Sequence, residues 1–165
     1  MEIYEIKAPP TSHEVIITWI IKAPRRIVFR TITDPLLIPK WWGPRRFTTK
    51  VIKMIVMPGG IWHYIQTDKE GKDYGFHGVY HDVVEPECLV YTSEYEGVPG
   101  QVTLYKDQLS EQDGKTIITT HAIFQSIQVR DQMLRWGMEE GTAEMTSRLN
   151  ELLATQSLED ERKEK

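Results

Sequence analysis

The chain has 165 residues and a formal net charge of −4 at pH 7. Apolar residues make up 40% and charged residues 27% of it, a composition that excludes a disordered, collagen-like or membrane-spanning chain. This length predicts one domain that buries its own core, and five Trp, seven Tyr and four Phe predict that the core is aromatic.

Cysteine content and charge distribution indicate in which compartment the protein works and which partners it can have. The single cysteine, Cys88, cannot form an intramolecular disulfide, which fits a reducing compartment. We find no signal-peptide pattern and no apolar run near the ~18 residues that span a bilayer, so we expect a cytoplasmic protein without a membrane partner. Residues 1–60 carry ten Lys/Arg and four Asp/Glu, whereas residues 61–165 carry ten and twenty. The basic part leaves open a local anion site, with a solvated surface as the plainer interpretation, and the acidic remainder argues against a nucleic-acid groove.

The first third of the chain predicts one strand and two short helices. Residues 1–12 end in a double proline and predict an extended leader. Residues 13–22 are rich in β-branched and aromatic residues and predict a strand. A proline then opens a predicted helix at 24–31, and an Asp-Pro pair predicts a second helix of one or two turns from Pro35.

The middle of the chain predicts a run of hairpins, and the end predicts one helix. Apolar segments separated by short polar turns predict strands at 47–57, 61–67, 74–84, 88–95, 101–109 and 115–124. From Val129 onward, apolar residues follow helical periodicity without a proline, so we predict one long helix. Residues 155–165 predict a charged, frayed tail. Segregated helices and strands predict an α+β fold, in which the long helix covers an antiparallel sheet of about six or seven strands.

Short motifs follow one another in an order typical of one family. They are Ala23-Pro24, Thr33-Asp34-Pro35, Trp41-Trp42-Gly43-Pro44, Pro58-Gly59-Gly60, Gly78-Val79-Tyr80, Pro86-Glu87-Cys88-Leu89-Val90 and Arg148-Leu149-Asn150-Glu151. Over roughly residues 13–154, which we expect to be the single domain, the chain resembles stand-alone bacterial members of the family named after the activator of the Hsp90 ATPase (AHSA1-like). That family belongs to the START-like, or SRPBCC, superfamily.

The resemblance implies a fold, a site and a range of activities. The implied fold is the helix-grip fold, a curved antiparallel sheet around a long C-terminal helix, often with a cavity for apolar small molecules between them. Some superfamily members are enzymes, such as polyketide cyclases and aromatases. The chain is too short to add the second domain that binds Hsp90 in the co-chaperone, so Hsp90 is not an expected partner. Two positions depart from the family pattern: Trp19 stands where a basic residue is common, and Thr142 where an aromatic is common.

Inward-facing strand residues and one helix face supply the candidate cavity lining. The candidates are Trp42, Met54, Trp62, Tyr64, Phe76, Tyr80, Tyr91, Phe124, Met133, Gly137, Met138 and Gly141. Gly137 and Gly141 lie four apart on the predicted helix, where each glycine costs about 1 kcal/mol relative to alanine. Their presence indicates either a close approach of the sheet or space kept for a ligand. Plain core packing stays the alternative for the whole set.

The sequence offers little support for catalysis. His77 and His81 would lie about 13 Å apart on a strand, too far to share a metal ion. We find no nucleophile elbow, phosphate loop or dinucleotide fingerprint, and predict no metal, no cofactor and no catalytic residue. The sequence therefore favours a protein that binds an apolar or aromatic small molecule. It leaves open a cyclase- or hydrolase-like enzyme, and an interaction module that includes a homodimer.

Overall fold

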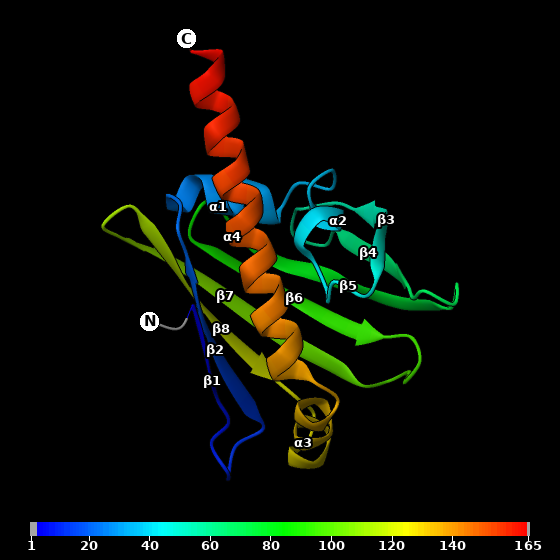
Figure 1. Cartoon of the computed structure of the whole chain (residues 1–165). Coiled ribbons are helices and arrows are strands. Elements are labelled where there is room, and N and C mark those ends of the chain that lie inside the picture. The colour runs from blue at the N-terminus through cyan, green and yellow to red at the C-terminus, as the bar shows by residue number, and fades with distance from the viewer. Residues whose placement is uncertain (1–2, 165) are drawn as a thin grey trace.

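A single antiparallel sheet of eight strands wraps around the long C-terminal helix in this computed structural model, which describes residues 3–164 (Figure 1). In spatial order the strands are β1 (Tyr4–Lys7), β2 (Glu14–Ile21), β8 (Lys115–Ile123), β7 (Val102–Gln112), β6 (Cys88–Tyr95), β5 (Asp73–Val84), β4 (Ile61–Thr67) and β3 (Thr48–Met54). The predicted α+β, helix-grip architecture is confirmed. Strands β3 to β8 each pair with the next in the chain, which is the predicted meander.

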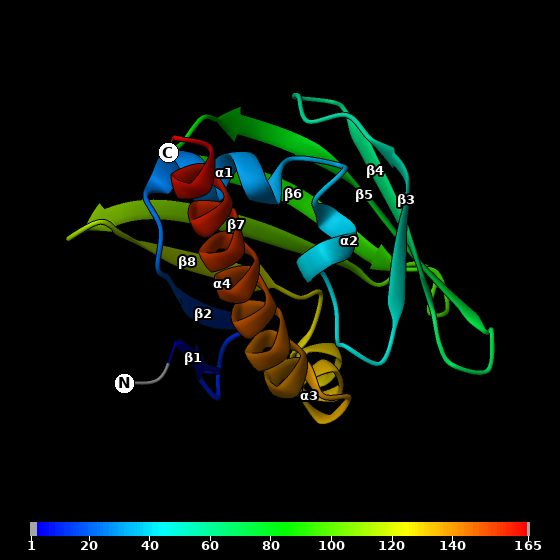
Figure 2. The same ribbon diagram turned by 45° about the horizontal axis from the view of Figure 1, so that its top comes forward.

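The connection between β2 and β3 carries both short helices. Helix α1 (Arg25–Ile32) and helix α2 (Ile38–Trp41) take the chain past α4 from one part of the sheet to its far edge (Figure 2). The second helix begins later than the predicted Pro35. Asp34 Oδ1 accepts a hydrogen bond from the amide of Leu36 at 2.9 Å, so the Asp-Pro pair forms a turn, and one helical turn follows it.

The sheet has eight strands, whereas about six or seven were expected, because the leader contributes β1. Its register with β2 places Ile6 opposite Ile17. The buried Arg130 guanidinium donates hydrogen bonds to the carbonyls of Pro9 and Ser12, which fixes the segment after β1. A segment that contains two prolines is thereby held by backbone pairing on one side and by a buried side chain on the other.

The predicted single C-terminal helix is wrong in one respect: it is divided into α3 (Ile127–Arg135) and α4 (Met138–Lys163). Ser126 caps α3 by accepting from the amide of Val129. Gly137, with φ 94°, adopts a left-handed conformation that helical residues do not have, and periodicity alone does not reveal this break. Beyond residue 154 the sequence predicts fraying, yet α4 continues to Lys163. The last turn carries basic residues, whose charge interacts favourably with the negative end of the helix dipole.

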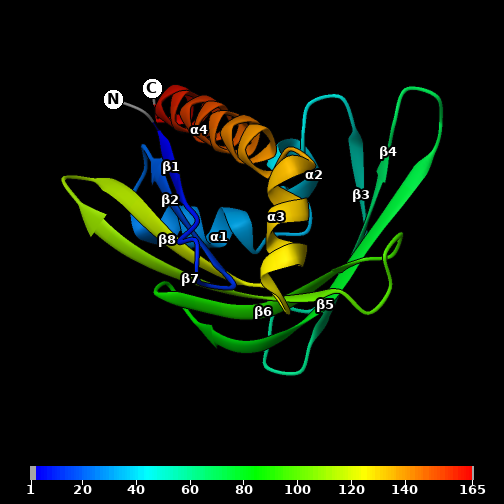
Figure 3. The same ribbon diagram turned by 90° about the horizontal axis from the view of Figure 1, so that it is seen from below.

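Helix α4 lies across the concave face of the curved sheet, as the view from below shows (Figure 3). The main core cluster joins the sheet to α1, α2 and α4, and includes Phe29, Trp41 and Leu149. A second cluster, around Val15 and Phe124, lies beneath α3. Strand β3 shifts its register against β4 between Val51 and Lys53. No helix within residues 3–164 is long and apolar enough to cross a membrane.

Candidate ligand cavity

A cavity of about 310 Å³ lies between the concave face of the sheet and the helices, partly open to solvent. The strands contribute Ile17, Trp19, Trp62, Tyr64, Tyr80, Leu89, Tyr91, Ser93, Tyr105, Asp107, Ile118 and Thr120. The helices and their connections contribute Ile32, Ile38, Trp41, Trp42, Met133, Trp136, Gly137, Met138, Gly141, Thr142, Met145 and Leu149. The volume is at the lower end of the ~300–1,000 Å³ typical of small-molecule sites. The cavity therefore suits a compact, mostly apolar molecule.

Nine of the twelve sequence candidates line this cavity. They are Trp42, Trp62, Tyr64, Tyr80, Tyr91, Met133, Gly137, Met138 and Gly141. They come from β4, β5, β6, the α2–β3 connection and both parts of the C-terminal helix, so the fold brings together residues up to a hundred positions apart.

The other three candidates do not line the cavity, although the period-two pattern places them on inward faces. Met54 packs against the main core, with its sulfur 3.5 Å from the Tyr64 hydroxyl. Phe76 stacks on Tyr95 with 5.1 Å between ring centroids. Phe124 is fully buried in the second core cluster under α3. Alternation assigns a face of the sheet, but it does not say which part of that face is already covered.

An aromatic wall forms around Trp42, which follows α2. Its ring contacts those of Tyr64 and Phe76 edge-on, with centroids 5.1 and 5.3 Å apart. Trp62 Nε1 donates to the carbonyl of Thr92 at 3.0 Å, which fixes the second indole. A Cβ on Gly78 would lie 1.8 Å from that carbonyl oxygen and 2.7 Å from Trp62 Nε1. Glycine at this position therefore leaves room for the hydrogen bond between the Trp62 indole and the Thr92 carbonyl.

The two helix glycines have different explanations. A Cβ on Gly141 would meet no heavy atom within 4 Å, so the sheet does not approach it closely and the space beside it is open. Gly137 lies at the left-handed junction before α4, so the backbone conformation explains why a glycine stands at this position. Of the two interpretations that the sequence left open, space at the cavity is the one that Gly141 supports.

The sequence analysis missed the polar group of this cavity, Asp107 on β7. Its Oδ1 accepts from Thr120 Oγ1 at 2.6 Å, and its Oδ2 accepts from the Tyr91 hydroxyl at 3.2 Å. Burial raises the pKa of the Asp107 carboxyl to about 6, although both hydrogen bonds act in the opposite direction. The available signal was its position two residues from Tyr105 and from Leu109 on the same inward face.

Four tyrosines surround this region, and burial keeps their hydroxyls protonated. Desolvation is the main cause that raises the pKa of Tyr80 and of Tyr105 to about 12, and it raises the pKa of Tyr64 and of Tyr91 further. Tyr91 also stacks on Tyr105, with centroids 5.4 Å apart and planes inclined by 10°. The cavity thus offers flat aromatic faces and neutral hydroxyl groups beside one carboxyl group.

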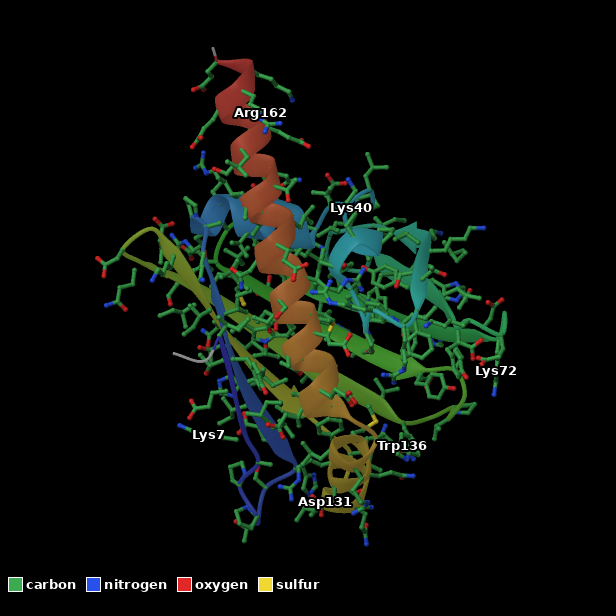
Figure 4. All side chains as sticks on the ribbon, viewed as in Figure 1. Lys7, Lys40, Lys72, Asp131, Trp136 and Arg162 are labelled. Carbon is green, nitrogen blue, oxygen red and sulfur yellow. The ribbon has the colours of Figure 1, made fainter. Side chains whose placement is uncertain are left out.

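Both positions that depart from the family pattern line the cavity. Trp19 lines the cavity, and its buried indole Nε1 has no hydrogen-bond partner among the described residues. The Thr142 hydroxyl donates to the Met138 carbonyl at 2.8 Å within α4, so it adds no free polar group. Trp136, 54% exposed, lies where α3 meets α4 (Figure 4) and contributes to the rim.

The histidines lie elsewhere. His77 contacts Glu94 at 2.9 Å and Glu96 at 3.0 Å, and His63 contacts Glu96 at 2.8 Å. None of these side chains lines the cavity. Within residues 3–164, no group of three His, Cys, Asp or Glu side chains is arranged to hold a metal ion.

A family model for "Activator of Hsp90 ATPase homolog 1-like protein" matches residues 22–154. The match covers most of the chain, and the protein therefore belongs to this family, as its motifs predict. No curated protein matches the chain in sequence.

Solved structures share the fold at low sequence identity. A protein from Rhodobacter sphaeroides is 21% identical with a TM-score of 0.86, covering 93% of this chain and 99% of that one. Protein Ms6760 from Mycobacterium smegmatis is 24% identical with a TM-score of 0.82, covering 90% and 95%. DynU16, a putative protein of the dynemicin biosynthetic locus, is 17% identical with a TM-score of 0.62, covering 87% of this chain and 48% of that one. At these identities the likeness concerns the fold alone.

Proposed function

We propose that this protein binds a compact apolar or aromatic small molecule in the cavity between the sheet and α4, without transforming it. One observation carries the proposal: a space of about 310 Å³, partly open to solvent, that is lined mostly by aromatic and aliphatic side chains. A ligand of matching shape gains dispersion contacts with these side chains and removes apolar surface from water. The lining residues, including the nine predicted from the sequence, are the proposed contacts.

Binding of a fluorescent apolar probe tests this function. We expect N-phenyl-1-naphthylamine to bind with increased emission, and Gly141→Leu to weaken binding at least about tenfold because leucine fills the open space. Ala154→Leu, which adds similar bulk at an exposed position of α4, is the matched control and should bind as the parent does. Failure of the parent to bind any apolar probe, or equal binding by both variants, would contradict the proposal.

One observation favours a second candidate, a cavity enzyme of the cyclase or hydrolase kind. Asp107 is an ionisable group in the cavity with a perturbed pKa, and such groups often act as general acids or bases. This candidate requires turnover that Asp107→Asn abolishes while the apolar probe still binds. Binding without turnover across esters and polyketide-like substrates would leave the first function.

The proposed partner is thus a small molecule, with neither nucleic acid nor Hsp90 required, and the proposed location is the cytoplasm. The basic residues of the first third are distributed over α1, α2, the following loop and β3. One of them, Arg45, is paired with Glu151 at 2.6 Å. A homodimer stays a prediction, which a measurement of the molecular mass in solution would test.

A further inference from the structure

Asp107 is a carboxylate with unused acceptor capacity inside an apolar cavity. It is 8% exposed, and it lines the cavity from the inward face of β7. Each of its oxygens accepts one hydrogen bond, from Thr120 and from Tyr91. A carboxylate oxygen accepts two hydrogen bonds, so both oxygens retain a lone pair. The two donors hold the carboxylate in one orientation relative to the cavity.

The charge of Asp107 has no counter-charge from the chain itself. None of the ion pairs formed within residues 3–164 includes it. Apart from the four tyrosines, Asp107 is also the sole acid or base among the described lining residues, and the tyrosines are neutral. Helices α3 and α4 contribute only apolar residues, glycines and Thr142 to the lining. A buried carboxylate of this kind is costly unless a partner supplies positive charge.

The neighbouring aromatic faces also favour a cation. Tyr91 donates to Asp107 and stacks on Tyr105, which stands two residues from Asp107 on the same side of β7. Aromatic rings attract an ammonium group placed over their faces, most strongly where water is excluded. A carboxylate beside stacked rings is therefore suited to a protonated amine and unsuited to an anion.

We propose that the cavity recognises compact hydrophobic amines, whose protonated nitrogen pairs with Asp107 while their apolar part lies against the aromatic wall. This inference rests on the proposed binding function and narrows its ligand class.

Three probes with the same ring and different charge test the inference. 2-Phenylethylamine, 2-phenylethanol and phenylacetate compete with N-phenyl-1-naphthylamine at pH 8, where Asp107 is ionised and the amine is protonated. We expect the amine to bind at least about tenfold more tightly than the alcohol, and phenylacetate to bind most weakly. This comparison uses the unmodified protein, so it does not depend on how any variant folds.

Asp107→Asn provides the second arm. It should weaken the binding of the amine at least about tenfold and leave the affinity for the alcohol within about twofold of the parent value. The control Asp82→Asn, at an exposed position of β5, should change neither affinity. Equal or tighter binding of the alcohol or the acid overturns the amine class, as does amine affinity that survives Asp107→Asn. If the fluorescent probe binds but none of the three displaces it, the amine class fails and the binding function stands. If the fluorescent probe does not bind at all, both fail.

Discussion

Replacing Asp107 with asparagine keeps the size of the side chain but removes its charge. Folding raises the pKa of this carboxyl from 3.8 to about 6, mainly through desolvation. The folded protein therefore holds the Asp107 proton more tightly than the unfolded chain does. By linkage, the stability that Asp107 contributes to the native state of the parent falls as the pH rises from about 4 to about 6, and this loss is complete above that range.

The size of this effect follows from the difference between the two pKa values. A difference of about two pH units, at 1.36 kcal/mol each, amounts to about 3 kcal/mol. Asp107→Asn does not titrate, so its stability relative to the parent should rise by most of that amount, about 2 kcal/mol, between pH 4 and pH 7. For a chain of this length, the corresponding change in the difference of melting temperatures is about 4–8 °C.

Urea unfolding of both proteins at pH 4, 5, 6 and 7, followed by tryptophan fluorescence, measures the effect. Taking the difference between variant and parent cancels the contributions of all other titrating groups. The same substitution at the exposed Asp82 is the control, because that side chain is solvated in both states. A difference that stays flat from pH 4 to pH 7, or that moves against Asp107→Asn as the pH rises, would refute the reasoning.

Three further substitutions test the roles assigned to a backbone junction, a cavity residue and a core residue. Gly137→Ala should lower the free energy of unfolding by about 1–2 kcal/mol, because alanine strains the left-handed junction before α4; an unchanged urea midpoint would argue against that strain. Gly141→Ala should raise thermal stability by up to about 1 kcal/mol, since its Cβ enters open space within a helix, and a loss of stability would reveal an unnoticed contact. Phe124→Ala should lower the free energy of unfolding in urea by about 3–5 kcal/mol and leave the affinity for the apolar probe unchanged. A large drop in affinity would indicate that Phe124 lines the cavity after all.

Most of the fold follows from local signals in the sequence. Alternation and turn residues locate the six strands of the meander, because each hairpin closes between chain neighbours. The leader strand β1 is harder to predict, since its pairing with β2 depends on a long-range register and on Arg130. The junction at Gly137 is also hidden, because glycine within an apolar periodicity is compatible with both a continuous and a broken helix.

The cavity follows from the sequence only in part. Its aromatic residues are predictable because they lie on inward faces, yet Phe124 shares such a face and is covered by other side chains. Asp107 escapes prediction for the opposite reason. An acidic residue in an alternating strand normally indicates the solvent side, and only its contacts with Tyr91 and Thr120 show that it faces inward.

Within residues 3–164, the open sheet ends at two strands without a further neighbour, β1 and β3. Such edges can recruit strands from other copies of a chain and so begin aggregation. Here β1 is only four residues long and carries the exposed Lys7–Glu5 pair, with 3.4 Å between the charged atoms. Strand β3 carries Lys50 and Lys53, and its shifted register interrupts the ladder next to the second lysine. Part of the basic charge in the first sixty residues thus discourages strand exchange between neighbouring molecules at the far edge of the sheet.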